Sequence, residues 1–178
     1  MITTDIARFL GRKTLLAGEV NSGKTTKTKD ILHQFLAAGY AKDLAILDLA
    51  PDPIRGIGGK LSINDAPDVL YLTDHIAAPR LMGRDAAHTL ELATNNARTI
   101  EKLFTHLGRH TRDFLFINDA TLYLQAGNMD LFLGLLAKSS TTIINAYYGS
   151  SFDESELTRR ERQLTNILME NCDTITLL

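Results

Sequence analysis

A chain of 178 residues with 44% hydrophobic and 22% charged residues has the ordinary composition of a globular protein, and we expect one domain spanning residues 1–178. The formal net charge of −2 gives no reason to expect a surface that binds nucleic acid or an anionic membrane. The one cysteine, Cys172, cannot form an internal disulfide, and no Cys/His cluster has zinc spacing, which indicates a reducing, cytoplasmic compartment.

The first part of the chain alternates between strand and helix patterns. A short helix is expected over residues 4–10. Residues 1–10 lack a long apolar run, so no signal peptide is expected there. Residues 13–17 predict a strand, and a helix is expected over residues 24–38 with Gly39 as its stop. Residues 44–47 form a continuous apolar run, which is typical of a strand buried on both faces. A loop rich in Pro and Gly follows as far as Asp65.

The same alternation continues to the end of the chain. One apolar stripe predicts a long helix over residues 85–107, and Ser151 with Glu154 has the spacing of a capping box for a helix that reaches Met169. No apolar run approaches the ~20 residues of a membrane span. The remaining expected elements are strands at 69–72, 114–117, 141–144 and 175–178 and a short helix at 129–137.

This order of elements predicts an α/β fold, a three-layer sandwich with a mostly parallel sheet. Ligands of such sheets bind at the carboxyl ends of the strands. The segments that follow the predicted strands are therefore expected to form the rim of one site, and they are residues 18–26, 48–60, 73–75, 118–121 and 145–149.

The first of these segments carries the most specific motif of the chain. Residues 18–25 read Gly-Glu-Val-Asn-Ser-Gly-Lys-Thr, which matches G-x-x-x-x-G-K-[ST] between a predicted strand and a predicted helix. Gly18 and Gly23 permit backbone angles that turn N–H groups inward, and the helix that follows adds its positive end. Lys24 is expected to reach the outer phosphates of a ligand, and Thr25 offers a hydroxyl to Mg²⁺.

On this motif the chain resembles the P-loop (Walker A) NTPases. The resemblance implies binding of a nucleoside triphosphate, ATP or GTP, together with Mg²⁺. It also implies the residues that contact the nucleotide, which are Gly18, Asn21, Ser22, Gly23, Lys24, Thr25 and Thr26.

Two aspartates compete for the metal beside Thr25. Asp48 directly follows a four-residue apolar run, whereas Asp119 follows its run one place later, after Asn118. The segment that begins at Asp48 is loosely similar to the second strand of the subclass that contains signal-recognition GTPases, GPN-loop GTPases and partitioning ATPases. In that subclass acids after two strands face the metal, so the two candidates need not exclude each other.

The chain also departs from those families. Glu19 stands where the partitioning ATPases carry an extra lysine, and the GPN signature is absent. Of a guanine-reading Asn-Lys-x-Asp, residues 145–148 keep only Asn145, so ATP is favoured over GTP. No glutamate closely follows Asp119, which argues against the ATPase branch that activates water with such a residue.

Other residues have weaker signals. Arg55 and Lys60 flank four residues rich in glycine, in a loop that either closes on a phosphate or is an ordinary surface loop. We include Arg55 with Lys24, Asp48 and Asp119 among the candidate catalytic residues. Tyr147 and Tyr148 fit packing better than stacking on a base. The charges of residues 154–162 fit a solvated, ion-paired helix face.

The sequence thus predicts an ATPase or GTPase that acts as a switch or motor. The alternatives are a kinase for a small molecule or nucleotide and a regulator that binds nucleotide without hydrolysing it. The stripe over residues 85–107 exceeds what one sheet face needs, so a protein partner or a homodimer is one interpretation and simple coverage of the sheet is the other.

Overall fold

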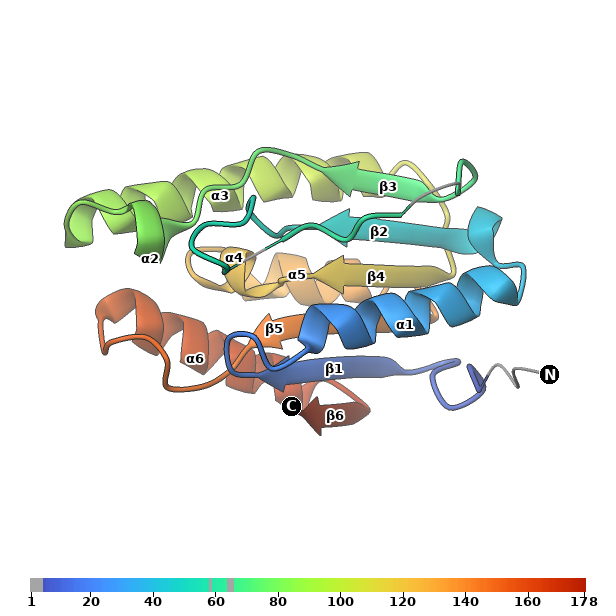
Figure 1. Ribbon diagram of the computed structural model, residues 1–178. Helices are drawn as coiled ribbons and strands as arrows, with labels where there is room; N and C mark the ends of the chain where they lie inside the picture. The colour runs from blue at the N-terminus through green and yellow to red at the C-terminus, as the bar shows by residue number, and fades with distance from the viewer. Residues whose placement is uncertain (1–4, 58, 64–65) are drawn as a thin grey trace.

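The computed structural model describes residues 5–57, 59–63 and 66–178. They form a six-stranded sheet with helices on both faces, so the predicted three-layer α/β architecture is confirmed (Figure 1). The strands are β1 Lys13–Gly18, β2 Leu44–Asp48, β3 Leu70–Thr73, β4 Phe114–Asn118, β5 Thr141–Tyr147 and β6 Thr174–Leu177. The α-helices are α1 Lys24–Ala37, α2 Pro79–Met82, α3 Ala86–Leu107, α4 Thr121–Leu124, α5 Met129–Leu136 and α6 Glu156–Glu170, and a 3-10 turn spans Ala41–Asp43.

The sheet has the order β3-β2-β4-β5-β1-β6, and each neighbouring pair of strands is parallel. All carboxyl ends therefore lie at one edge, where the arrowheads point in Figure 1. Residues of β2 and β4 are almost all inaccessible to solvent, because helices or loops cover both faces of the central strands. This arrangement brings the loops after β1, β2, β4 and β5 together above the sheet.

Each face of the sheet has its own core. The helix α1 packs on one face, together with Ile6, Phe9 and Leu61 from the flanking loops. The other face is covered by α3, α5 and α6, and the C-terminal part of the α3 stripe is buried there. Nearer the start of α3 the side chain of Leu90 is 44% exposed, so the stripe extends beyond its own sheet. In the described part of the chain no helix combines the length and apolar character needed to cross a membrane.

Three predicted elements are wrong or misplaced. Residues 6–12 form two successive turns rather than a helix. Phe9 N–H donates to Ile6 O, and Arg12 N–H donates to Phe9 O. Gly11 adopts left-handed backbone, which ends the second turn. The helix α6 is capped by Ser155, whose Oγ accepts from Thr158 N–H at 3.1 Å, and not by Ser151.

The strand β5 continues to Tyr147, three residues beyond its predicted end. Two four-residue helices, α2 and α4, were not predicted, because single turns show no periodicity. Thr4, Gly58 and Asp65, which fall within the predicted N-terminal helix and the loop after β2, lie outside the described residues.

Candidate functional site

The loop between β1 and α1 forms a cup of backbone N–H groups. Asn21 and Gly23 have φ angles of 59° and 91°, and this left-handed backbone turns the intervening N–H groups toward one side. No described side chain caps the start of α1 at Gly23, so the first turn is open to an anion. A Cβ at Gly18 would collide with the backbone oxygen of Leu178, which explains why this position requires glycine.

The cup opens into a cavity of about 390 Å³, a volume typical of small-molecule sites. All predicted nucleotide-contacting residues from Asn21 to Thr26 line it, whereas Gly18 lies outside the wall at the end of β1. The rest of the wall comes from the loop after β2, from α2, from the segment after β4 and from the end of β5. Residues 73–75, which the sequence placed on the rim, are replaced there by residues 78–81.

Lys24 lies inside the cup and lines the cavity. Its Nζ donates to the backbone oxygen of Glu19 and to Ser22 Oγ, the latter at 3.4 Å. Burial lowers the pKa of Lys24, and the nearby charges of Asp119 and Glu19 oppose that shift. With these two acceptors, one of the three N–H donors of the Lys24 ammonium remains for a ligand oxygen.

Asp119 faces the cup from the end of β4. It lines the cavity, adopts a φ of 56°, and its N–H donates to Asn145 Oδ1 at 2.7 Å. Burial raises the pKa of Asp119 to about 6, while a hydrogen bond from Thr121 and the charge of Lys24 partly offset this effect. Burial thus penalises the charged form of this carboxylate, and a bound cation would offset that penalty.

Asp119→Asn is expected to stabilise the ligand-free protein near pH 8, because asparagine cannot ionise and tolerates the left-handed backbone. The side chain of Asp119 is partly exposed at the cavity wall. The raised pKa, discounted for that exposure, corresponds to on the order of 1–2 kcal/mol. The gain should shrink as the pH falls through about 6 and vanish below the ordinary Asp value of 3.8, where Asp119 is protonated in both states. Urea denaturation of both proteins in EDTA at several pH values measures this difference. A constant difference at every pH would contradict the assigned cause.

Thr25 and Asp119 together fit Mg²⁺. Both line the cavity, and the burial of Asp119 leaves its carboxylate in need of a cation. Among the described residues no group of three or more His, Cys, Asp or Glu could hold a metal ion by itself. Mg²⁺ suits such a sparse set, because it commonly takes its other ligands from phosphate oxygens and water.

Asp48 has a different environment from Asp119. It is completely buried and does not line the cavity. Its Oδ2 accepts from Leu61 N–H at 2.5 Å and from the Tyr71 hydroxyl at 2.6 Å, and its Oδ1 accepts from Asn118 Nδ2 at 2.8 Å. Both oxygens are therefore occupied by donors from the loop after β2, from β3 and from β4, and the geometry favours Asp119 over Asp48 as the metal ligand.

The positive charge of the β2–β3 loop that reaches the cavity is Lys60. Arg55 is exposed at the tip of a small hairpin closed by Ile54 and Ile57, away from the cavity wall. Lys60 lines the cavity, and its Nζ donates to the backbone oxygens of Ala50 at 2.6 Å and Asp74 at 3.2 Å. An ammonium group has three N–H donors, so one remains for a ligand oxygen.

Glu19 connects the cup to the loop after β5 by hydrogen bonds. Its carboxylate accepts hydrogen bonds from the backbone N–H groups and hydroxyls of Ser150 and Ser151. These bonds lower the pKa of Glu19 to about 2. Sequence reasoning noted this glutamate only as a missing lysine, since its partners lie more than 130 positions away.

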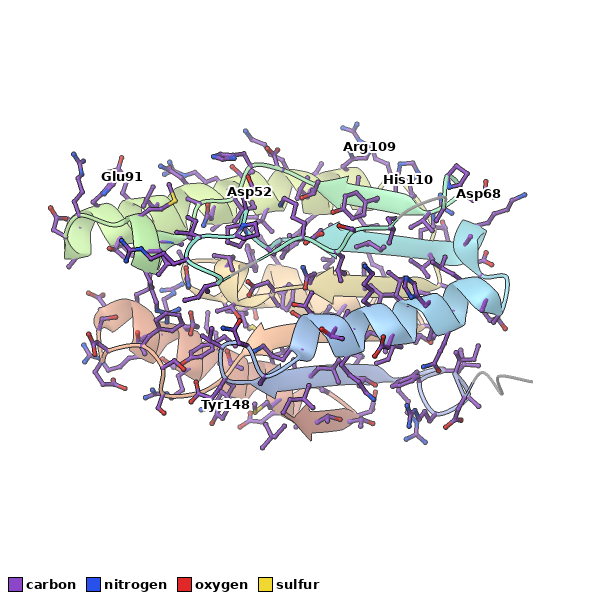
Figure 2. The ribbon with its side chains drawn as sticks, viewed as in Figure 1. Asp52, Asp68, Glu91, Arg109, His110 and Tyr148 are labelled. Carbon is purple, nitrogen blue, oxygen red and sulfur yellow. The ribbon has the colours of Figure 1, made fainter. Side chains whose placement is uncertain are left out.

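Glu161 corrects the prediction of a solvated face on α6. Its side chain is buried and binds Arg80 and Gln125, although Arg162 and Glu154 do form an exposed ion pair. Of the two tyrosines after residue 146, only Tyr147 lines the cavity. Tyr148, labelled in Figure 2, packs beside the core on the α6 face.

The predicted strand–loop–helix setting of residues 18–26 is present, and it faces a cavity with Lys24, Lys60 and Asp119 on the wall. Thr25 lies on the same wall, next to the lysine of the loop. Comparison of the chain with models of protein families gives no match, and a search of curated protein sequences returns no relative.

Proposed function

We propose that this protein binds a nucleoside triphosphate with Mg²⁺ in the cavity above β1 and hydrolyses it as a switch or motor. The single observation that carries the proposal is the open cup at residues 18–26, whose helix N-terminus and Lys24 line one cavity with Asp119. Backbone N–H groups, a lysine and a metal-binding carboxylate are the groups that phosphoryl chemistry needs.

The charges on the cavity wall support a ligand with several negative charges. Lys24 and Lys60 each carry a cation there, whereas the cation of Arg80 is already matched by Glu161 at 2.7 Å. Asp119 is the carboxylate that faces the two lysines, and Mg²⁺ would compensate it. A polyphosphate with a bound divalent ion balances this arrangement better than a neutral ligand does.

ATP is the proposed nucleotide. Asn145, the one residue left of a guanine-reading motif, has its amide occupied by Thr28, Asn118 and the N–H of Asp119. Both N–H donors of this amide are used, so none remains to bind an acceptor on the edge of a base. This occupancy supports the sequence argument against GTP.

One observation favours phosphoryl transfer as a second candidate function. The cavity extends past the cup to Arg80, Gln125 and Phe152, so it has room for a molecule beyond the terminal phosphate. In that case the same cup would hold the donor nucleotide, and the far end would hold the acceptor.

A thermal-shift panel tests the proposed function. Mg–ATP, Mg–GTP and their diphosphates are added separately at equal concentration, and a ligand that binds the native state raises the melting temperature, more so the tighter it binds. Hydrolysis without an added acceptor supports the ATPase, while turnover only with an added metabolite supports the kinase. No shift with any of these nucleotides would overturn the proposal.

Lys60→Met is expected to weaken binding of Mg–ATP roughly tenfold, the loss of one charge-assisted hydrogen bond. Tripolyphosphate should lose affinity by the same factor, since the interaction is with phosphate and not with the base. Titration calorimetry measures both. Lys42→Met, at an exposed position on the opposite end of the sheet, is the matched control. If Lys60→Met bound both ligands as tightly as wild type, Lys60 would not contact the phosphates, and its hydrogen bonds to two backbone carbonyls would be its role.

A further inference from the structure

The far end of the cavity contains a compact polar cluster of three side chains. Oε2 of Glu161, on α6, accepts from Arg80 Nη1 at 2.7 Å and from Gln125 Nε2 at 3.0 Å. Arg80 belongs to α2 and Gln125 follows α4, and both line the cavity. Since one guanidinium faces one carboxylate, the cluster has no net charge. It therefore differs from the end of the cavity that contains the two lysines.

Two polar atoms of this cluster have no partner among the described residues. They are Nε of Arg80, a donor, and Oε1 of Gln125, an acceptor, and both are buried. Gln125 is only 3% exposed. The neighbouring Glu161 carboxylate fixes its amide orientation, because the NH₂ group must face that oxygen. Buried polar atoms without partners are rare, so the donor and the acceptor left over beside one carboxylate are available to a ligand.

Two aromatic rings lie beside the same cluster. The guanidinium of Arg80 lies over the ring of Phe152 at 4.5 Å, and that ring contacts Tyr147 edge-on at 5.0 Å between centroids. Phe152 belongs to the loop after β5 and covers the guanidinium of Arg80. A planar ligand can take the place of this ring on the guanidinium, since arginine stacks on flat groups.

We propose that Arg80, Gln125 and Phe152 form a subsite for a neutral planar ring that carries a hydrogen-bond donor next to an acceptor, as the edge of a nucleobase does. The ring's donor binds Gln125 Oε1, its acceptor binds Arg80 Nε–H, and Phe152 moves aside. The inference rests on the proposed function, because the ring is either the base of the bound triphosphate or that of a second nucleoside beside it.

The test uses Gln125→Met, which removes the acceptor at nearly equal length, and Arg80→Lys, which removes Nε–H and keeps the charge beside Glu161. Gln163→Met makes the same chemical change at an exposed position of α6 and is the control. Calorimetry measures affinities for the Mg²⁺ complexes of ATP, GTP, CTP, UTP and base-free tripolyphosphate. The four nucleosides are then titrated into protein saturated with tripolyphosphate.

If the base of the triphosphate fills the subsite, each cluster variant loses roughly tenfold in affinity for the preferred nucleotide and keeps its affinity for tripolyphosphate. If a second nucleoside fills it, nucleotide affinities stay unchanged and nucleoside binding to the saturated protein is lost. Should Gln125→Met fail to fold, Arg80→Lys gives the same comparison.

Affinities equal to wild type in both variants, for nucleotides and nucleosides alike, would overturn the inference. An equal loss for tripolyphosphate and nucleotides would also overturn it, since the cluster would then only support the fold. Wild-type protein that binds tripolyphosphate but no base would overturn the inference while leaving the proposed function intact. Wild-type protein that binds neither tripolyphosphate nor any nucleotide would overturn both.

Discussion

Asp48→Ala is expected to lower the free energy of unfolding by about 3–5 kcal/mol, because it leaves three donors without their acceptor in the interior. The affected groups are the N–H of Leu61, the hydroxyl of Tyr71 and the amide of Asn118. Leu61 is itself 1% exposed, so its backbone cannot turn to water without opening the loop. Urea denaturation monitored by circular dichroism measures the loss.

Asp52→Ala is the matched control for this substitution. Asp52, labelled in Figure 2, is an exposed residue of the same loop, and its removal should change stability by less than about 0.5 kcal/mol. If Asp48→Ala instead unfolded like wild type and lost only its response to Mg²⁺, Asp48 would serve the metal after all. The pair of variants therefore separates the two roles that the sequence left open for this aspartate.

Lys24→Ala should weaken binding of the Mg–triphosphate by roughly 1.5–3 kcal/mol, the loss of a charge-assisted hydrogen bond. Stability without ligand should change little, since Lys24 lies on the cavity wall and burial already disfavours its charged form. Calorimetry gives the affinity, and the melting temperature gives the stability.

Lys27→Ala, at an exposed position of the same helix, is the control for charge alone. It should leave the affinity for the Mg–triphosphate within about twofold of wild type, because salt screens the charge of an exposed side chain. Equal losses in both variants would show that long-range attraction, and not the Lys24 ammonium itself, accounts for the binding.

The parts of the fold that could be predicted are those with a strong local pattern. Residues 44–47 and 114–117 are continuous apolar runs and became the central strands β2 and β4. The apolar stripe of α3 and the glycine after α1 are likewise local sequence patterns, and they predict α3 and the end of α1. The end of β5 could not be predicted, because Asn145 is polar and stays in a buried strand only through amide contacts with Thr28 and Asn118.

The candidate site likewise contains residues that a local pattern predicts and residues that it does not. The cup could be predicted because eight consecutive residues determine it. Arg55 and Lys60 look alike in sequence, and only the folded loop shows that Lys60 lines the cavity. Glu161 was expected on a solvated face because α6 is rich in charge, and its burial follows from Arg80, a residue 81 positions earlier. Pairings of this kind depend on the tertiary fold and have no local signal.

The hydrogen bonds from Ser150 and Ser151 to the Glu19 carboxylate imply that the two ends of the cavity are energetically coupled. Ser151 is bonded to Phe152 in the chain, and Glu19 carries the carbonyl that holds Lys24. A displacement of the Phe152 backbone would move Ser151, and through the Glu19 side chain it would act on the residue whose carbonyl accepts from Lys24. Occupancy at either end should alter the affinity at the other, and by thermodynamic reciprocity the two factors must be equal.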